Sequence, residues 1–276
     1  MVKTLFRKLR SSMPKPIRKA AFRAARFLGS GLYPVYPSID GTLKYLREWG
    51  FKPAAVIDVG AYHGLWTELF RSIFPGAKSL MIEGQEAKAA ALREFCAKAG
   101  GDVTFETALL GARDGETVRF VEMETGSSVL EEASPYARNY VERTLTTLDS
   151  VLARHPAFQK ADFLKLDVQG YELDVLRGAS AALQKAEFVL MEASLIPINR
   201  GCPLISEVID FMSSRDFRLL DFCSQSRLPP FPVHLRDPPR PPREHCSRET
   251  QNQNQPLITQ TFTSGFTSAC SLIATL

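Results

Sequence analysis

Cysteine pairs, metal-ligand spacings and long apolar runs are all missing from this chain, and each absence excludes a class of protein. The five cysteines among 276 residues are widely spaced, odd in number and never arranged as C-x-x-C. A disulfide scaffold and a zinc finger are therefore excluded, and we expect no metal site and a reduced, cytoplasmic protein. No apolar run approaches the roughly 18–20 residues that span a bilayer, and we expect no secretory signal at the basic N-terminus.

Acidic residues are missing from positions 1 to 39, while the same stretch holds nine lysines and arginines. The net charge of +4 is therefore concentrated in a basic N-terminal arm, which we delimit as residues 1–38. Apolar residues at helical spacing over 17–28 fit an amphipathic helix that lies on an anionic membrane surface. A helix that is solvated or packed on the domain is the alternative that we favour. Aromatic interleaving and binding motifs are missing, so we expect no nucleic-acid partner.

Residues 39–227 alternate strand patterns with helix patterns, which predicts one α/β domain. Short apolar runs predict strands at 54–59, 79–82, 103–110, 117–123, 163–168, 188–191 and 217–222. Apolar residues at helical spacing predict helices at 66–73, 87–99, 173–183 and 204–212. Strands separated by helix-length segments imply right-handed crossovers and a mostly parallel, doubly wound sheet.

Proline dominates the start of the remaining segment, residues 228–276. Seven prolines between positions 228 and 242 exclude helix and strand interiors, and a run of glutamine and asparagine follows at 251–255. We expect a disordered tail, with 257–263 as its only candidate strand. A linker is the interpretation that we favour, and a docking ligand for a partner module is the alternative.

The first motif with chemical content is Asp58-Val59-Gly60-Ala61-Tyr62-His63-Gly64, at the end of the first predicted strand. A glycine at this position lets the backbone approach a ligand, and the next helix points its N-terminus at that ligand. The spacing is not the G-x-G-x-x-G of a dinucleotide fold, which argues against a nicotinamide oxidoreductase. An acid suits a cofactor that carries an amino acid and a sulfonium. The alternative is a purely structural turn.

The second motif is Glu83-Gly84, which ends the next predicted strand 25 residues after Asp58. A carboxylate there can accept both hydroxyls of a ribose. The alternative is an exposed carboxylate at a helix start, where the helix dipole favours it. Because Asp58 and Gly60 precede it, we prefer the ribose role.

The third motif places Lys165 and Asp167 two residues apart on one face of an apolar strand. Buried charges of this kind need partners or a polar cleft, so the pair is either a structural ion pair or part of a site. The functional interpretation puts Asp167 beside the group to be transferred. His63 is a second candidate base, because an imidazole titrates near neutral pH, and it is equally interpreted as a packing residue.

These motifs together resemble the FkbM family of methyltransferases. The resemblance rests on Phe163-Leu-Lys-Leu-Asp167-Val-Gln-Gly170-Tyr-Glu172, Leu176-Arg-Gly178-Ala179, Val56-Ile-Asp58-Val-Gly60-Ala61, Ile82-Glu83, Gly126-Ser-Ser128 and Thr147-Leu-Asp149. It covers roughly residues 39–225 and implies a Rossmann-like class I methyltransferase fold that uses S-adenosylmethionine. We accordingly assign cofactor binding to Asp58, Gly60, Ala61, Gly64, Glu83 and Gly84, and catalysis to Asp167 and His63.

The resemblance implies O-methylation of a small-molecule or glycan acceptor, such as a hydroxyl on a sugar, a natural product or a lipid-linked substrate. The alternative function is a catalytically degenerate binding module that acts through the basic arm and the proline-rich tail. One departure bears on this choice. The antiparallel strand that closes such sheets is not evident after residue 227, so we expect it to be missing or aberrant and suggest a frameshifted tail.

Overall fold

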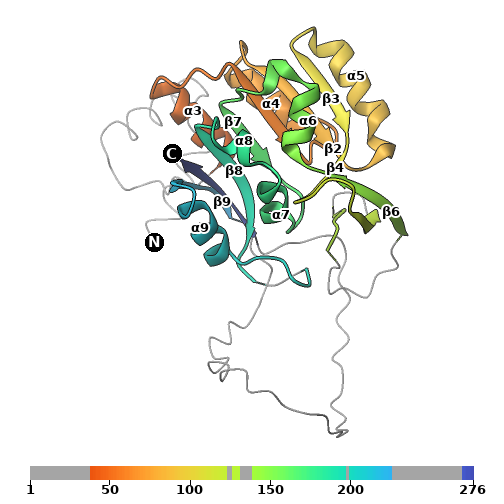
Figure 1. Cartoon of the computed structure of the whole chain (residues 1–276). Helices are drawn as coiled ribbons and strands as arrows, with labels where there is room; N and C mark the ends of the chain where they lie inside the picture. Colours follow the sequence, from red (N-terminus) through yellow and green to blue (C-terminus); the bar gives the residue numbers. More distant parts are fainter. Residues whose placement is uncertain (1–37, 123–125, 131–138, 197–198, 226–268) are drawn as a thin grey trace, which may run out of the picture. The chain divides into compact units, whose positions relative to one another are not determined.

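Seven strands form the central sheet of this computed structural model, which describes residues 38–122, 126–130, 139–196, 199–225 and 269–276. In chain order these strands are β1 (Ala55–Val59), β2 (Lys78–Glu83), β3 (Val103–Thr107), β7 (Phe163–Leu166), β8 (Phe188–Ser194), β9 (Arg218–Gln225) and β10 (Ala269–Thr275). Their order in space is β3-β2-β1-β7-β8-β10-β9 (Figure 1). The first five pair in parallel, so the predicted mostly parallel, doubly wound sheet is confirmed.

Helices cover both faces of this sheet. One face packs against α3 (Ile39–Glu48), α4 (Leu65–Ile73) and α5 (Ala89–Ala99), and the other against α6 (Leu148–Arg154), α7 (Glu172–Arg177), α8 (Ser180–Leu183) and α9 (Ile205–Ser213). Side chains of β1 alternate between the two layers, since Val56 packs with α3 and α4 while Ile57 packs with the other layer. All of β1 is buried, as expected for a strand covered on both sides.

The closing strand is present, so the prediction that it is missing or aberrant is wrong. β10 runs antiparallel between β8 and β9 and pairs with both along its length. Leu272 and Ile273 are buried on opposite faces of the sheet, which is why this short apolar segment completes the core. The sequence prediction failed because β10 follows a long polar segment instead of a tight turn. The frameshift suggestion rested on the absence of this strand and loses its support.

The basic arm lies outside the described residues, apart from Ser38, and so does most of the tail, including the candidate strand at 257–263. The arm boundary and the amphipathic helix therefore remain predictions. The tail boundary at 227 does not mark the end of the domain, because β10 belongs to the central sheet. Within the described ranges, no helix is both long and apolar enough to cross a membrane.

A second, three-stranded sheet lies next to the first and has the order β4-β6-β5. Its strands are β4 (Leu109–Leu110), β5 (Thr117–Glu122) and β6 (Asn139–Thr146). The single strand predicted over 103–110 is therefore divided in two. Ala108 donates its N–H to the carbonyl of Glu83 and ends the first sheet, and Leu109 then pairs with Leu145 in the second.

The helix predicted over 173–183 is also divided, at Gly178. A Cβ at Gly178 would lie 2.2 Å from the carbonyl oxygen of Gly111, so only glycine allows the two backbones to approach this closely. Gly178 also contacts α6, because its carbonyl oxygen accepts the N–H of Asp149 at 3.1 Å. This contact joins the helix after β7 to the helix that follows the small sheet.

Asp114 fixes the start of α6 and gives a prediction on acid stability. Its carboxylate accepts hydrogen bonds from the Thr147 N–H (2.8 Å) and the hydroxyls of Ser150 (2.8 Å) and Thr146 (2.9 Å). These bonds, the Thr147 N–H first, lower the pKa of Asp114 to about 2. A depressed pKa contributes stability above the unfolded value of about 4, and that stability is lost as the pH falls towards 2.

At neutral pH, we expect Asp114→Asn to have a lower free energy of unfolding than wild type. This difference is expected to decrease steadily as the pH falls below 4, because only the wild type has a carboxylate that becomes protonated there. Urea denaturation between pH 2 and pH 7 measures this. Asp210→Asn, at an exposed position of α9, is the matched control and is expected to follow the wild-type curve. A constant gap between Asp114→Asn and wild type at every pH would contradict the assignment.

Candidate functional site

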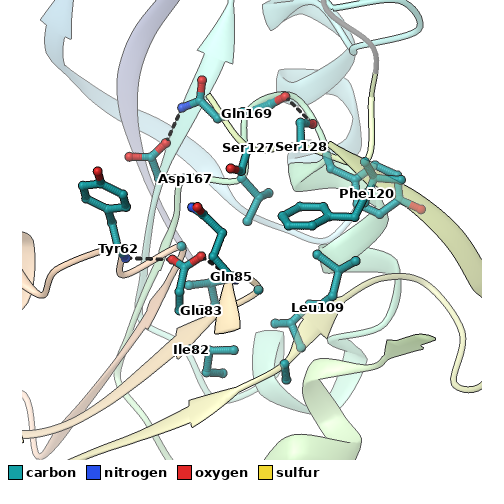
Figure 2. Close-up of a pocket in the computed structure, with 18 residues that line it drawn as sticks. Tyr62, Ile82, Glu83, Gln85, Leu109, Phe120, Ser127, Ser128, Asp167 and Gln169 are labelled. Carbon is teal, nitrogen blue, oxygen red and sulfur yellow. Dashed lines mark hydrogen bonds between the residues drawn. The ribbon is translucent and has the colours of Figure 1, made fainter. Parts of the chain in front are cut away.

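A cavity of about 250 Å³ opens at the carboxyl ends of β1, β2 and β7, where it borders the small sheet (Figure 2). Parallel strands that end at one sheet edge commonly form ligand crevices of this kind. Its lining comes from the three strand ends and from the small sheet: Gly60, Tyr62, Glu83, Gly84, Gln85, Leu109, Phe120, Ser127, Ser128, Asp167, Gln169 and Tyr171, among others. Polar groups from the strand ends and apolar side chains from the small sheet therefore meet in one cavity.

Gly60 joins the three strand ends. Its N–H and that of Ala61 both donate to the carbonyl of Ile82, at 2.9 and 3.2 Å. Gly60 has a φ of +75°, and a Cβ there would lie 1.9 Å from the carbonyl oxygen of Asp167. Only glycine satisfies both conditions, so this residue sets the spacing between the ends of β1 and β7.

Glu83 points into the cavity from the end of β2 (Figure 2). Its Oε2 accepts the N–H of Tyr62 at 2.8 Å, and its Oε1 accepts the N–H of Gln85 at 2.9 Å. Glu83 is only 6% exposed, and these two hydrogen bonds replace the contacts with water that its carboxylate loses on burial. Each carboxylate oxygen has a further lone pair, so Glu83 can accept two more donors from a ligand.

Asp58 does not line the cavity, although the sequence analysis assigns it to cofactor binding. It is fully buried, accepts the hydroxyl of Thr67 at 2.7 Å and lies 2.9 Å from the ammonium of Lys165, its partner across the β1–β7 register. Lys165 thus forms its closer ion pair with Asp58, whereas the sequence analysis considered it together with Asp167, which lies 3.8 Å away. Lys165 also donates a hydrogen bond to the Gly60 carbonyl at 3.0 Å, so the buried ion pair stabilises the glycine turn.

The charge of Lys165 is maintained by its neighbours. Burial favours the neutral amine, but attraction by Asp58 and, secondarily, Asp167 outweighs burial and raises the pKa of Lys165. The Asp167 carboxylate is 3.8 Å away and 44% exposed. Lys165 therefore connects a buried carboxylate to one that lines the cavity.

Three further predicted residues lie outside the cavity lining. His63 is exposed, stacks on Tyr62 with ring centroids 4.0 Å apart, and is not among the residues that line the cavity. Ala61 is buried in the core with Met81, and Gly64 begins α4 with a φ of +80°. Gly60, Glu83, Gly84 and Asp167 are the predicted site residues that the structure brings together.

Gln169 is a site residue that the sequence analysis missed. It has a φ of +56°, which is unusual for a residue with a side chain. Its carbonyl accepts hydrogen bonds from the Ser128 hydroxyl (3.0 Å) and the Asn199 amide (2.6 Å), so two other segments fix this conformation. Its side-chain amide donates to Asp167 and Glu192.

The sequence analysis also did not identify several other residues that line the cavity. Phe120 stands next to Val121 on β5 and both are buried, so the sequence does not distinguish a pocket wall from a core position. Gln85 directly follows Glu83-Gly84, and this proximity is the signal that could have identified it. Ser127 and Ser128, which the sequence analysis names only as part of the family resemblance, both line the cavity.

Glu172 fixes the loop that follows β7. It is 2% exposed and accepts the N–H groups of Val168 (3.0 Å) and Gly170 (3.2 Å). Burial raises the pKa of Glu172 to about 7, against the effect of these hydrogen bonds. Two carboxylates therefore lie near the end of β7: Asp167 lines the cavity, and Glu172 is buried in the loop that follows.

Comparison with known proteins gives a family and a set of distant structures. A family model described as a methyltransferase FkbM domain matches residues 58–219. No curated protein matches the chain in sequence.

Solved structures with similarity include a precorrin-6y C5,15-methyltransferase from Geobacter metallireducens GS-15, with 10% identity, a TM-score of 0.43 and coverage of 86% of this chain and 87% of that one. An O-methyltransferase family protein from Burkholderia thailandensis has 9% identity and a TM-score of 0.42, with 86% of this chain and 55% of that one covered. A SAM-dependent methyltransferase from Aquifex aeolicus has 16% identity and a TM-score of 0.35, with 65% and 80% covered.

Proposed function

Since this chain belongs to the FkbM family of S-adenosylmethionine-dependent methyltransferases, we propose that it methylates a hydroxyl oxygen of a sugar, natural product or lipid-linked acceptor. The observation that carries the cofactor assignment is the joint placement of Glu83 and Gly60 at one cavity. An acid at the end of β2 and a glycine turn at the end of β1 together suit a nucleoside with an attached amino acid.

The residues of the cavity fit this cofactor in three respects. Glu83 has free lone pairs for two ribose hydroxyls. Leu109 and Phe120 supply apolar surface for a purine ring, and Gly60 lets the ends of β1 and β7 lie close together at the edge of the cavity. We propose that Glu83, Gly84 and Gly60 contact the cofactor directly, and that Asp58 acts indirectly by holding Lys165 under the turn.

When bound, S-adenosylmethionine supplies a methyl group whose bond to sulfur breaks with the electron pair left on sulfur, while the acceptor oxygen gains the methyl group and loses its proton. We assign proton acceptance to Asp167, because its carboxylate lines the cavity and is 44% exposed. His63 is the weaker candidate, since it lies outside the lining. The walls of the cavity orient the two reactants, which supplies much of the rate in a transfer of this kind.

Replacement of Glu83 tests the cofactor assignment. We expect Glu83→Ala to weaken binding of both S-adenosylmethionine and S-adenosylhomocysteine about 10–100-fold, because hydrogen bonds to a charged group contribute about 1.5–3 kcal/mol. Isothermal titration calorimetry measures both affinities. Glu83→Gln keeps one acceptor oxygen and is expected to lie between wild type and Glu83→Ala.

The control for this experiment is Glu68→Ala, at an exposed position of α4, which is expected to bind as wild type does. Thermal unfolding of each variant shows whether the loop that Glu83 supports through Tyr62 and Gln85 remains intact. Unchanged affinity in a folded Glu83→Ala protein contradicts the ribose assignment. A wild-type chain that binds neither cofactor favours the binding-module alternative.

A further inference from the structure

Two carboxylates lie close together near the end of β7, and cofactor binding does not account for this arrangement. Asp167 and Glu192 directly follow Leu166 and Met191, which are register partners on β7 and β8. We call these two residues the acidic pair. One nitrogen, Nε2 of Gln169, donates to Asp167 Oδ1 at 2.8 Å and to Glu192 Oε2 at 2.9 Å. An uncharged amide bridges two carboxylates without neutralising either, so their repulsion remains.

The charged groups around Glu192 favour a proton on the pair. Burial is the largest effect, repulsion from Asp167 and Glu172 adds to it, and Lys165 opposes it, so that the pKa of Glu192 is raised to about 8. On β10, burial and, secondarily, the Glu192 carboxylate raise the pKa of the Cys270 thiol, whose register partner on β8 is Ala193. Lys165 has the smallest of these effects on Glu192, because its ammonium is nearest to Asp58, at 2.9 Å, and next to Asp167, at 3.8 Å.

Gln169 keeps the acidic pair in this arrangement. Its backbone is in the left-handed region, at a φ of +56°, which is costly for a residue with a side chain unless the surroundings fix it. Ser128 and Asn199 donate to its carbonyl from two separate segments, which leaves the side-chain amide directed at the two carboxylates. Gln169 is therefore a positioning residue for the pair.

Resting on the methyl transfer proposed above, we propose that the acidic pair carries one proton when the cavity holds no cation and releases it when the sulfonium of S-adenosylmethionine binds. One positive charge then replaces another beside the pair, so the net charge of the site is unchanged. In the transfer, the acceptor hydroxyl loses its proton as the sulfonium charge disappears, and the emptied pair takes up that proton. The pair thus distinguishes the charged cofactor from its neutral product, S-adenosylhomocysteine.

Proton counting by calorimetry tests this exchange without an acceptor. Binding of each cofactor to the full chain is titrated at pH 7 in phosphate and in Tris, whose ionisation enthalpies differ, and the difference in apparent binding enthalpy gives the protons released. We expect S-adenosylmethionine to release about one proton more than S-adenosylhomocysteine. Glu192→Gln is expected to abolish this difference. Glu187→Gln, at an exposed position just before β8, is the matched control and is expected to keep it.

A second measurement covers the case in which Glu192→Gln does not fold. In wild-type protein labelled with carboxyl-13C glutamate, the Glu192 resonance at pH 7 is expected at a protonated position without cofactor and at an ionised position with S-adenosylmethionine. Equal proton release for both cofactors, or an unchanged difference in Glu192→Gln, overturns the inference and leaves the proposed function intact. Failure of wild type to bind S-adenosylmethionine refutes the proposed function instead.

Discussion

Lys165→Met is expected to lower the free energy of unfolding by about 3–5 kcal/mol, because it leaves the Asp58 carboxylate buried without its cation. Asp58 is fully buried, and Lys165 is its nearest charged partner, at 2.9 Å. The Thr67 hydroxyl remains as a hydrogen-bond donor but carries no charge. Urea denaturation at pH 7, analysed from the midpoint and the slope, measures the loss.

A double-mutant cycle separates the ion pair from the packing of the lysine stem. Asp58→Asn combined with Lys165→Met removes both charges, so we expect this double variant to be more stable than Lys165→Met alone. Lys185→Met, at an exposed position, is the control and is expected to change stability by less than about 0.5 kcal/mol. A double variant that is no more stable than Lys165→Met would show that the pair does not act as a unit.

Gly60→Ala is expected to cost about 2–5 kcal/mol of stability and to abolish measurable cofactor binding. The φ of +75° strains any side chain by about 1–2 kcal/mol, and forced repacking adds about 1–3 kcal/mol. The added Cβ meets a backbone oxygen, that of Asp167, at 1.9 Å, so the ends of β1 and β7 must separate. Denaturation and calorimetry on the same preparation measure both losses.

Gly115→Ala provides a control matched in conformation. Gly115 has a φ of +80°, but a Cβ there meets nothing within 4 Å, so this variant carries the backbone strain without the clash. We expect it to lose about 1–2 kcal/mol and to bind S-adenosylmethionine as wild type does. Equal losses in Gly60→Ala and Gly115→Ala would mean that the approach of β1 to β7 does not limit the site.

The sequence predicted the order of most elements, because their patterns are local. β1, β2, β5 and α4 occur within one or two residues of their predicted bounds. The sequence analysis missed α3, although Ile39, Leu43 and Leu46 lie at helical spacing in it. Two other missed elements have weak local patterns. β6 is a strand with most of its residues exposed or half-buried, and α6 has only two turns, so neither presents a clear apolar period.

The site residues also differ in how well the sequence alone predicted their positions. Glu83 and Gly60, which the sequence assigns to cofactor binding, both line the cavity, since each lies at the end of a parallel strand. Asp58 and His63 carried equal chemical weight in the sequence, yet one is buried under the turn and the other is exposed outside it. Which side of a turn a residue faces depends on the strands packed against it, and no local pattern records that.

Sequence alone determined the family, the parallel sheet and the strand ends where the chemistry lies, because burial period and turn residues act between near neighbours in the chain. Only the tertiary structure decided that Lys165 neutralises Asp58, that Gln169 bridges the acidic pair, and that β10 completes the sheet. Each of these depends on the register between segments far apart in the chain, which is fixed by the packing of the whole core.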